Sequence, residues 1–394
     1  MASVDVAVVG LGLIGSGALR HLAASGTDVV GIGPGEPVDL HFHDGAFASH
    51  YDSGRITRRL DPRREWAVLA GRAIAGYADL EAASGIAFHR PTGVVLAERE
   101  EARIASTLTN AASMDVPVTV VAPGAPSPHR DLLAFPPGSL LLCEPGPAGH
   151  IDPRRMLAAN LTVAQAQGAT VVRDEVIAIE PSDERWLLRT RGGRSIVAHQ
   201  VLVAAGPHAD EVLAGVVDRD AAPQFVVRGE TVVLATVDEP EQQRLGAMPS
   251  VLARMDHPTY ADLYVVPPTT YPDGSVRLKL GATRAEHRQL RTPEEKRAWM
   301  RGDEHRDELV ELRALLEELV PGLRASAWET KPCLITETPS ELPYLQHLGS
   351  ELVIAAGGNG FAAKSANAIG ALAADLLVTG QWSDPDLEAA AFRG

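Results

Sequence analysis

The stretch Val4–Gly17, V-D-V-A-V-V-G-L-G-L-I-G-S-G, decides the fold of this chain. Small and β-branched apolar residues lead directly into the glycine pattern Gly10-Leu11-Gly12-Leu13-Ile14-Gly15, which is typical of a buried parallel strand that turns into a helix. In such a turn the first glycine permits the bend, the second admits a pyrophosphate, and the third lets helix and strand pack closely. The free N–H groups of the helix attract that pyrophosphate. The stretch therefore predicts dinucleotide binding over a plain glycine-rich turn, with NAD and FAD both open.

Composition narrows the class of protein. The 394 residues are 45% hydrophobic and carry a formal net charge of −15, which suits roughly two domains and argues against a nucleic-acid partner. Cys143 and Cys333 are the only cysteines, too few for a disulfide framework, and we interpret Cys143 as a packing residue. No apolar run has the length of a membrane span, and the first strand leaves no room for a signal peptide. We expect a cytoplasmic enzyme, a monomer or small homo-oligomer, that takes a small-molecule substrate.

The end of the second expected strand, Asp28–Ile32, departs from the usual nucleotide-binding pattern. A carboxylate is expected there for the ribose hydroxyls, about 20 residues past the glycines. The sequence instead reads Gly33-Pro34-Gly35-Glu36, so Glu36 is the nearest substitute.

Apolar periodicity and turn residues divide the rest of the chain. Segments 88–142 and 223–324 are rich in short strands and are interpreted as insertions. Segments 1–87, 143–222 and 325–394 alternate strands with helices. We therefore expect an α/β (α+β, two-domain) fold, in which a discontinuous Rossmann-like nucleotide-binding domain supports a β-rich substrate-binding domain.

Individual elements follow from the same patterns. Asp152 is expected to cap a helix that has Pro153 at its first position. The strand Leu352–Ala356 leads into a second glycine turn, Gly357–Gly360, which favours FAD over NAD because an extended FAD commonly reaches a glycine turn late in the chain. The longer helices are expected at Leu13–Ala24, Arg63–Ala83, Glu98–Ala112, Glu304–Leu319 and Lys364–Leu377.

A histidine-rich loop raises the alternative of a metal site. His41, His43 and His50 lie close together with Asp44. Because no Cys or His-Glu framework accompanies them, we favour a solvated loop and expect no metal.

Five stretches, in order along nearly the whole chain, resemble flavin-dependent amine oxidases of the monomeric sarcosine oxidase and N-methyltryptophan oxidase type, in the D-amino acid oxidase-like superfamily. They are the glycine pattern at Val4–Gly15, the S-H-x-x-x-x-R-I-x-R loop at Ser49–Arg58, L-K-L-G at Leu278–Gly281, P-C-L-I-T at Pro332–Thr336, and I-A-A-G-x-x-G-x-x-x-K at Ile354–Lys364.

The resemblance implies roles for individual residues. Cys333 would hold FAD covalently as a thioether, where composition alone favours a small buried hydrophobe. Arg58 and Lys364 would bind the substrate carboxylate, since a guanidinium and an ammonium both attract it. Lys279 would assist oxygen reduction beneath the flavin, although strand alternation also allows it to point to solvent.

The remaining implied roles concern the flavin and its surroundings. Arg55 would lie over the flavin ring, and Tyr264 is expected in the substrate pocket. The residues expected to bind the cofactor are Gly10, Gly12, Leu13, Ile14, Gly15, Glu36, Ser49, Val176, Gly206, Cys333, Gly357, Gly358, Gly360 and Lys364.

The implied reaction transfers a hydride from the α-carbon of an amine to FAD, forms an imine, and returns the electrons to oxygen as hydrogen peroxide. Thr283 and Ile335 stand where sarcosine oxidases carry a His and a Tyr, and Tyr51 stands where a second His is usual. We therefore expect a less polar pocket and a larger secondary amine, such as a cyclic or N-methylated amino acid.

Three alternatives remain. A dehydrogenase would pass electrons to another acceptor, and a non-catalytic flavoprotein would have no need of Arg58, Lys279 and Lys364. An NAD-linked dehydrogenase leaves Cys333 and the second glycine turn unexplained.

Overall fold

The N-terminal strand and helix form as the sequence predicts. In the computed structural model, which describes residues 2–127, 129–183, 185–218, 222–349 and 351–394, strand β1 (Ala2–Val9) turns at Gly10 into helix α1 (Leu13–Ala24). The backbone N–H of Gly10 donates to the carbonyl of Ile32, which joins the turn to the end of the neighbouring strand.

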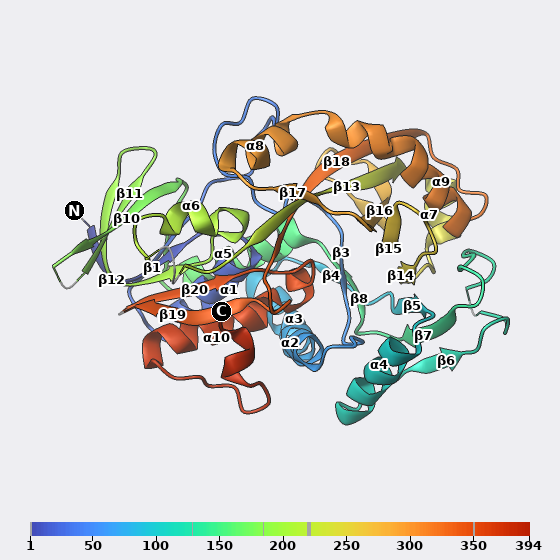
Figure 1. The fold of residues 1–394 in the computed structure, drawn as a ribbon, viewed down its shortest axis with the longest axis horizontal. Helices are drawn as coiled ribbons and strands as arrows, with labels where there is room; N and C mark the ends of the chain where they lie inside the picture. The colour runs from blue at the N-terminus through green and yellow to red at the C-terminus, as the bar shows by residue number, and fades with distance from the viewer. Residues whose placement is uncertain (1, 128, 184, 219–221, 350) are drawn as a thin grey trace.

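Strand β1 lies in the middle of the first sheet (Figure 1). The strands β9, β2, β1, β12 and β20 run parallel to one another, and three antiparallel strands flank them. Because parallel strands are buried on both faces, they read as continuous apolar runs in the sequence. The eight strands are β1, β2 (Val29–Ile32), β9 (Thr170–Val172), β10 (Val176–Ser182), β11 (Arg185–Thr190), β12 (Ser195–Val203), β19 (Tyr344–Gly349) and β20 (Leu352–Ala356).

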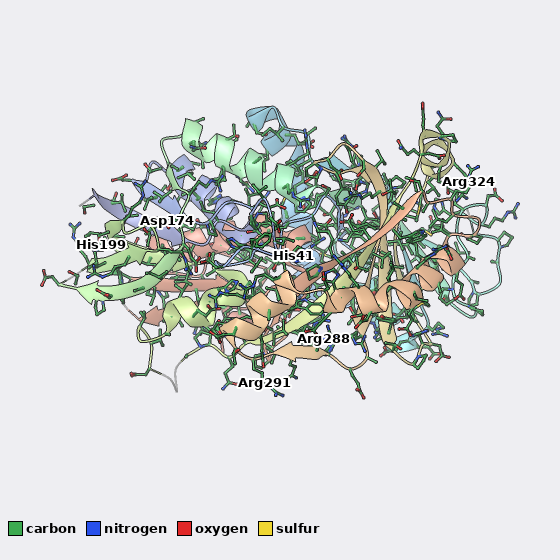
Figure 2. The ribbon with its side chains drawn as sticks, turned by 90° about the horizontal axis from the view of Figure 1, so that it is seen from above. His41, Asp174, His199, Arg288, Arg291 and Arg324 are labelled. Carbon is green, nitrogen blue, oxygen red and sulfur yellow. The ribbon has the colours of Figure 1, made fainter. Side chains whose placement is uncertain are left out.

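A second sheet of nine strands forms the other end of the molecule. In Figure 2, His199 of β12 and Arg324, which lies between α9 and β18, are at opposite ends of the molecule. The strands are β5 (Val94–Glu98), β6 (Thr119–Val121), β7 (Leu140–Glu144), β13 (Val226–Thr236), β14 (Ser250–Arg254), β15 (Tyr260–Thr270), β16 (Val276–Arg284), β17 (Arg288–Leu290) and β18 (Ala327–Glu337).

A small third sheet and the helices complete the fold. The third sheet joins β3 (Arg55–Thr57), β8 (Gly149–Ile151) and β4 (His89–Arg90). The α-helices after α1 are α2 (Arg64–Ala75), α3 (Tyr77–Ser84), α4 (Glu101–Ser113), α5 (Pro153–Ala166), α6 (Ala209–Leu213), α7 (Glu239–Leu245), α8 (Pro293–Arg301), α9 (Leu309–Leu319) and α10 (Ala362–Thr379). The 3₁₀ turns among the described residues are η1 (Gly206–His208), η2 (Glu304–Glu308) and η3 (Ala389–Phe392).

Most of the expected elements are present, and three differ. Asp152 caps α5 as expected, and its side chain accepts from the backbone N–H of Arg155. The helix expected at Arg63–Ala83 is instead the pair α2 and α3, because Gly76 breaks it. The helix expected from Glu304 begins as the 3₁₀ turn η2 and becomes α-helical only at Leu309.

The third difference concerns β18. This strand pairs with β13 over eleven residues and so lies in the second sheet. The sequence instead predicts that the whole segment 325–394 belongs to the nucleotide-binding domain. Strand β7, which ends at Glu144, also lies in that sheet. We propose that the chain returns to the nucleotide-binding domain after Glu337 and Glu144, with the other boundaries as expected.

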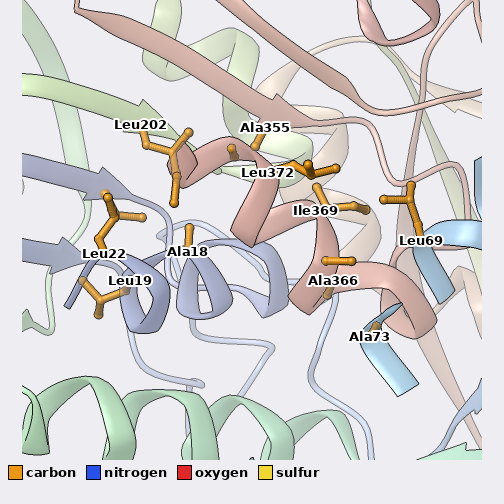
Figure 3. Close-up of a cluster of buried hydrophobic side chains, with 14 of the residues drawn as sticks. Ala18, Leu19, Leu22, Leu69, Ala73, Leu202, Ala355, Ala366, Ile369 and Leu372 are labelled. Carbon is orange, nitrogen blue, oxygen red and sulfur yellow. The ribbon is translucent and has the colours of Figure 1, made fainter. Parts of the chain in front are cut away.

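Helices α1 and α10 pack closely within the largest apolar core (Figure 3). Ala18 and Leu22 of α1 and Ile369 of α10 are almost fully buried there. A Cβ atom at Gly370 would lie 2.6 Å from the backbone nitrogen of Ala18, so this close approach requires glycine. No helix among the described residues is long and apolar enough to cross a membrane.

This packing leads to a prediction for Gly370→Ala. An overfilled core costs about 1–3 kcal/mol, so the variant should unfold at lower denaturant concentration. The matched control is Gly71→Ala in α2, where the nearest atoms lie 4.0 Å from the added Cβ. Because alanine favours helix over glycine, the control should be unchanged or more stable. Equal unfolding midpoints for the two variants would contradict the proposed role of the α1–α10 contact.

Candidate active site

A cavity of about 400 Å³ lies at the carboxyl ends of the parallel strands. Its wall includes both glycine turns, the residues that follow β12, the loop at Ala46–His50, and Cys333 to Thr336 of β18. Ligands of open parallel sheets bind at this edge of the sheet. The cavity is therefore lined by residues from both the first and the second sheet.

The first glycine turn fits a dinucleotide pyrophosphate. Gly10 has a φ of +95°, and a Cβ there would lie 2.5 Å from the carbonyl oxygen of Ala204. A Cβ at Gly12 meets nothing within 4 Å, so the backbone is open to the cavity at that point. No side chain caps α1 at Gly12, which leaves its first N–H groups available to a phosphate.

The position of the missing ribose-binding acid is closed by packing. A Cβ at Gly33 would lie 2.6 Å from the backbone nitrogen of Leu11. Glu36 does not line the cavity and instead pairs with Arg154, with 2.6 Å between Glu36 Oε1 and Arg154 Nη2. Glu175 and Arg191, which sequence reasoning missed, line the cavity as an ion pair.

Most of the other expected cofactor residues do line the cavity. Gly15 does not, because it lies against the turn, where a Cβ would come within 1.8 Å of the Gly10 oxygen. Lys364 is also absent from the wall, although Ala362 and Ala363 of the same helical turn contribute to it. The expected residues that line the cavity are Gly10, Gly12, Leu13, Ile14, Ser49, Val176, Gly206, Cys333, Gly357, Gly358 and Gly360.

Cys333 lies on β18 with its side chain on the cavity side. Cys333 and its neighbour Pro332 are half-buried, whereas Leu334 is 1% exposed. The guanidinium of Arg55 approaches the thiol, with 3.8 Å between Nη2 and Sγ, and also donates to the Ser49 carbonyl at 3.1 Å. The structure therefore brings Arg55, Ser49 and Cys333 together.

Asp52 is the centre of a buried charge cluster beside this thiol. Its carboxylate forms ion pairs with Arg55 and Lys279 and accepts from the Tyr271 hydroxyl at 2.9 Å. Lys279 is fully buried, donates to the Gly54 carbonyl at 2.9 Å, and lies 5.0 Å from the centre of the Tyr264 ring. Burial and the Arg55 charge lower the pKa of Lys279 well below its usual range, whereas Cys333 and Glu230 act in the opposite direction.

A second buried carboxylate joins the two residues expected to bind the substrate. Asp61 Oδ2 lies 2.8 Å from Arg58 Nη1 and 2.6 Å from Lys364 Nζ. Burial would raise the pKa of Asp61, but Lys364 and Arg58 outweigh it and lower the pKa to about 2. Burial and the Arg58 charge lower the pKa of Lys364 to about 8, against the opposing effect of Asp61. Two cations and one anion leave this group with a net charge of +1 when all are ionised.

An ion-pair network connects the cavity wall to the second sheet's helices. His208 Nδ1 lies 2.7 Å from Glu211 Oε1, and both side chains line the cavity. Lys296 of α8 is 1% exposed, and its Nζ lies 2.9 Å from both Asp210 Oδ1 and Glu211 Oε1. Burial would raise the pKa of Glu211, but His208 and Lys296 lower it to about 2.

The histidines of the loop lie in different surroundings. Over the described residues, no group of three or more His, Cys, Asp or Glu side chains is arranged to hold a metal ion. His41 Nδ1 lies 2.6 Å from the Arg301 carbonyl, while His50 lines the cavity. Burial lowers the pKa of His50 to about 4, so this imidazole is neutral at pH 7.

Sequence reasoning missed Asp52 and Asp61, although a local pattern could have identified them. Asp52 lies three residues before Arg55, and Asp61 lies three residues after Arg58. Opposite charges at this spacing beside a candidate site indicate an ion pair. The partners Lys279 and Lys364 lie more than two hundred residues away, and sequence spacing does not reveal them.

Comparison with known proteins identifies the family. The family model described as "DAO: FAD dependent oxidoreductase" matches residues 5–376. Monomeric sarcosine oxidase from Streptomyces avermitilis is 26% identical over 400 residues, which cover 97% of this chain and 95% of that protein.

Two solved structures share the fold. NikD, described as an unusual amino acid oxidase essential for nikkomycin biosynthesis, has a TM-score of 0.78 at 20% identity, over 100% of this chain and 98% of that one. Glycine oxidase from Geobacillus kaustophilus has a TM-score of 0.73 at 21% identity, again over 100% and 98% of the two chains.

The Asp61 contacts predict the stability of Asp61→Asn. Removing one partner of a buried ion pair leaves charges uncompensated, so the free energy of unfolding should fall by about 3–5 kcal/mol at pH 7. Because the folded pKa of Asp61 lies below the unfolded value of about 3.9, the wild-type advantage should be complete above that value and decline as the pH falls toward 2.

Denaturant unfolding at several pH values measures this difference. Asp131→Asn is the control, because the side chain of Asp131 is 94% exposed. A wild-type advantage that does not change between pH 5 and pH 2 would contradict the assigned role of Asp61.

Proposed function

Since the chain belongs to the DAO family of FAD-dependent oxidoreductases, we propose that it oxidises a secondary amine or imino acid, namely an N-methyl or cyclic amino acid. The observation that carries this proposal is the buried Arg58–Asp61–Lys364 group, whose net positive charge suits one substrate carboxylate. Lys364 belongs to the first turn of α10, and Ala362 and Ala363 of the same turn line the cavity. The similarity to a sarcosine oxidase and to the amino acid oxidase NikD supports an amino acid as the substrate class.

In the proposed reaction the substrate amine loses a hydride from carbon and a proton from nitrogen, which gives an imine that water hydrolyses. Bound FAD supplies the two-electron redox chemistry, and dioxygen receives the electrons as hydrogen peroxide. Arg58 and Lys364 fix the carboxylate and thereby orient the reacting C–H bond. Asp61 positions both cations, and the donors of Lys364 that do not face Asp61 remain for the substrate.

Lys279 and Arg55 are proposed to stabilise negative charge near the cofactor. Both contact the carboxylate of Asp52, so two cations share one anion in a buried environment. The excess positive charge favours anionic forms of the cofactor and of reduced oxygen. An acceptor other than oxygen would not require Lys279, and peroxide formation distinguishes the two cases.

Turnover of an amino acid panel tests the substrate class. We expect proline, pipecolate and larger N-methyl amino acids to give hydrogen peroxide at higher kcat/KM than sarcosine, because Thr283 and Ile335 leave more room than a His and a Tyr. Arg58→Ala should lose about 2–4 kcal/mol of transition-state binding for each substrate. Sarcosine turnover equal to that of pipecolate would contradict the larger substrate. Flavin reduction without peroxide would indicate a dehydrogenase.

Acid precipitation tests a covalent flavin. We propose that Cys333 holds FAD, because its thiol faces the cavity beside Arg55. The wild-type pellet should stay yellow, and Cys333→Ser should release the flavin to the supernatant. Cys143→Ser is the control and should keep its flavin in the pellet. A yellow Cys333→Ser pellet would contradict the proposal and would direct attention to His50.

A further inference from the structure

The face of the second sheet that carries Cys333 also carries a charge cluster with no role so far. Strand β18 lies beside β13 (Figure 1), and their register places Glu230 opposite Cys333 and Arg228 opposite Ile335. Residues directly opposite in an antiparallel ladder share a face, with Cβ atoms about 4.5–5.5 Å apart. Cys333 to Thr336 line the cavity, so Arg228 and Glu230 lie on the strand next to its wall and are not themselves among the lining residues.

The cluster is built around one guanidinium. Arg228 forms an ion pair with Glu230, and its Nε lies 2.7 Å from Glu337 Oε1. The Thr283 hydroxyl hydrogen bonds to Glu230, and His287 Nδ1 lies 3.4 Å from Arg228 Nη1. Arg228 is 6% exposed and Glu230 is 9% exposed, so both charges are largely removed from water.

The charges within this cluster do not balance. One guanidinium faces two carboxylates, which leaves these three groups with a net charge of −1 when all are ionised. Glu337 keeps 27% of its side chain exposed on the accessible face of β18. Burial raises the pKa of Glu230, with Arg228 opposing and Glu337 adding to that effect. A carboxylate in this position gains free energy from a further cationic partner.

We infer that Arg228, Glu230 and Glu337 form a specificity site for a basic group on the substrate, so that the preferred substrate is a secondary amino acid with a second, cationic nitrogen. This inference rests on the proposed function. Glu230 and Glu337 accept from the cationic group, and Arg228 positions the two carboxylates. Thr283, Ile335 and Tyr51 predict a less polar pocket. Arg228, Glu230 and Glu337 add charged groups next to it.

Three N-methyl amino acids that differ at the end of the side chain test the inference. Nα-methylornithine ends in an ammonium, N-methylnorleucine places a methyl group at the same point, and N-methylglutamate carries a carboxylate. Steady-state turnover by the holoenzyme with an artificial electron acceptor gives kcat and KM for each. We expect the ornithine derivative to be preferred over the norleucine derivative by about tenfold in kcat/KM, mainly through KM, and the glutamate derivative to be the poorest.

Variants locate the preference. Glu230→Gln and Glu337→Gln should each raise KM for the ornithine derivative by about tenfold and leave the norleucine derivative unchanged. Glu329→Gln is the matched control, because Glu329 lies on the same face of β18 but pairs with Arg277 at 3.4 Å. If Glu230→Gln fails to fold, Glu337→Gln alone tests the inference. The Glu337 side chain is 27% exposed, so this substitution disturbs the core less.

The possible outcomes separate this inference from the proposed function. Preference for the glutamate derivative would overturn the inference and would indicate that Arg228 binds a second carboxylate. An ornithine preference that survives in both variants would overturn it as well. Reduction of the flavin by none of the three substrates, nor by proline or pipecolate, would contradict the proposed function itself.

Discussion

The close contact between α1 and α10 is the constraint on which the cavity depends. The two helices come from opposite ends of the chain, and each follows a glycine turn that lines the cavity. Because Gly370 lets α10 approach the backbone of α1, the turns at Gly10–Gly15 and Gly357–Gly360 face one ligand-binding space. A polar chain supports the contact, since Asn160 of α5 donates to Asn367 of α10 and accepts from Arg20 of α1.

Buried carboxylates organise the charges around this space. Asp52 forms ion pairs with Arg55 and Lys279, whereas Asp61 forms ion pairs with Arg58 and Lys364. In both cases one anion compensates two cations, so the folded state tolerates the buried charges while a positive potential remains. An anionic ligand group is therefore better compensated in these places than a neutral one.

Sequence analysis predicted the parts of the fold that depend on local patterns. The strand and helix around Gly10–Gly15, the cap at Asp152 and the strand before Gly357 follow from short-range geometry. The pairing of β18 with β13 joins residues about one hundred positions apart, and an alternation pattern does not name its partner. The contacts of Asp61 with Lys364 and of Arg228 with Glu337 were missed for the same reason, because only the fold brings these partners near. The role of Cys333 came from resemblance, since a single cysteine has no pattern of its own.

The buried ammonium of Lys296 has a consequence for motion. Lys296 belongs to α8, beside the second sheet. It contacts Asp210 of α6 and the Pro207 carbonyl of η1, which lie beside the first sheet. Pulling these surfaces apart would expose the network to water and break several charge-assisted hydrogen bonds at once. Hinge opening at this contact is therefore unfavourable.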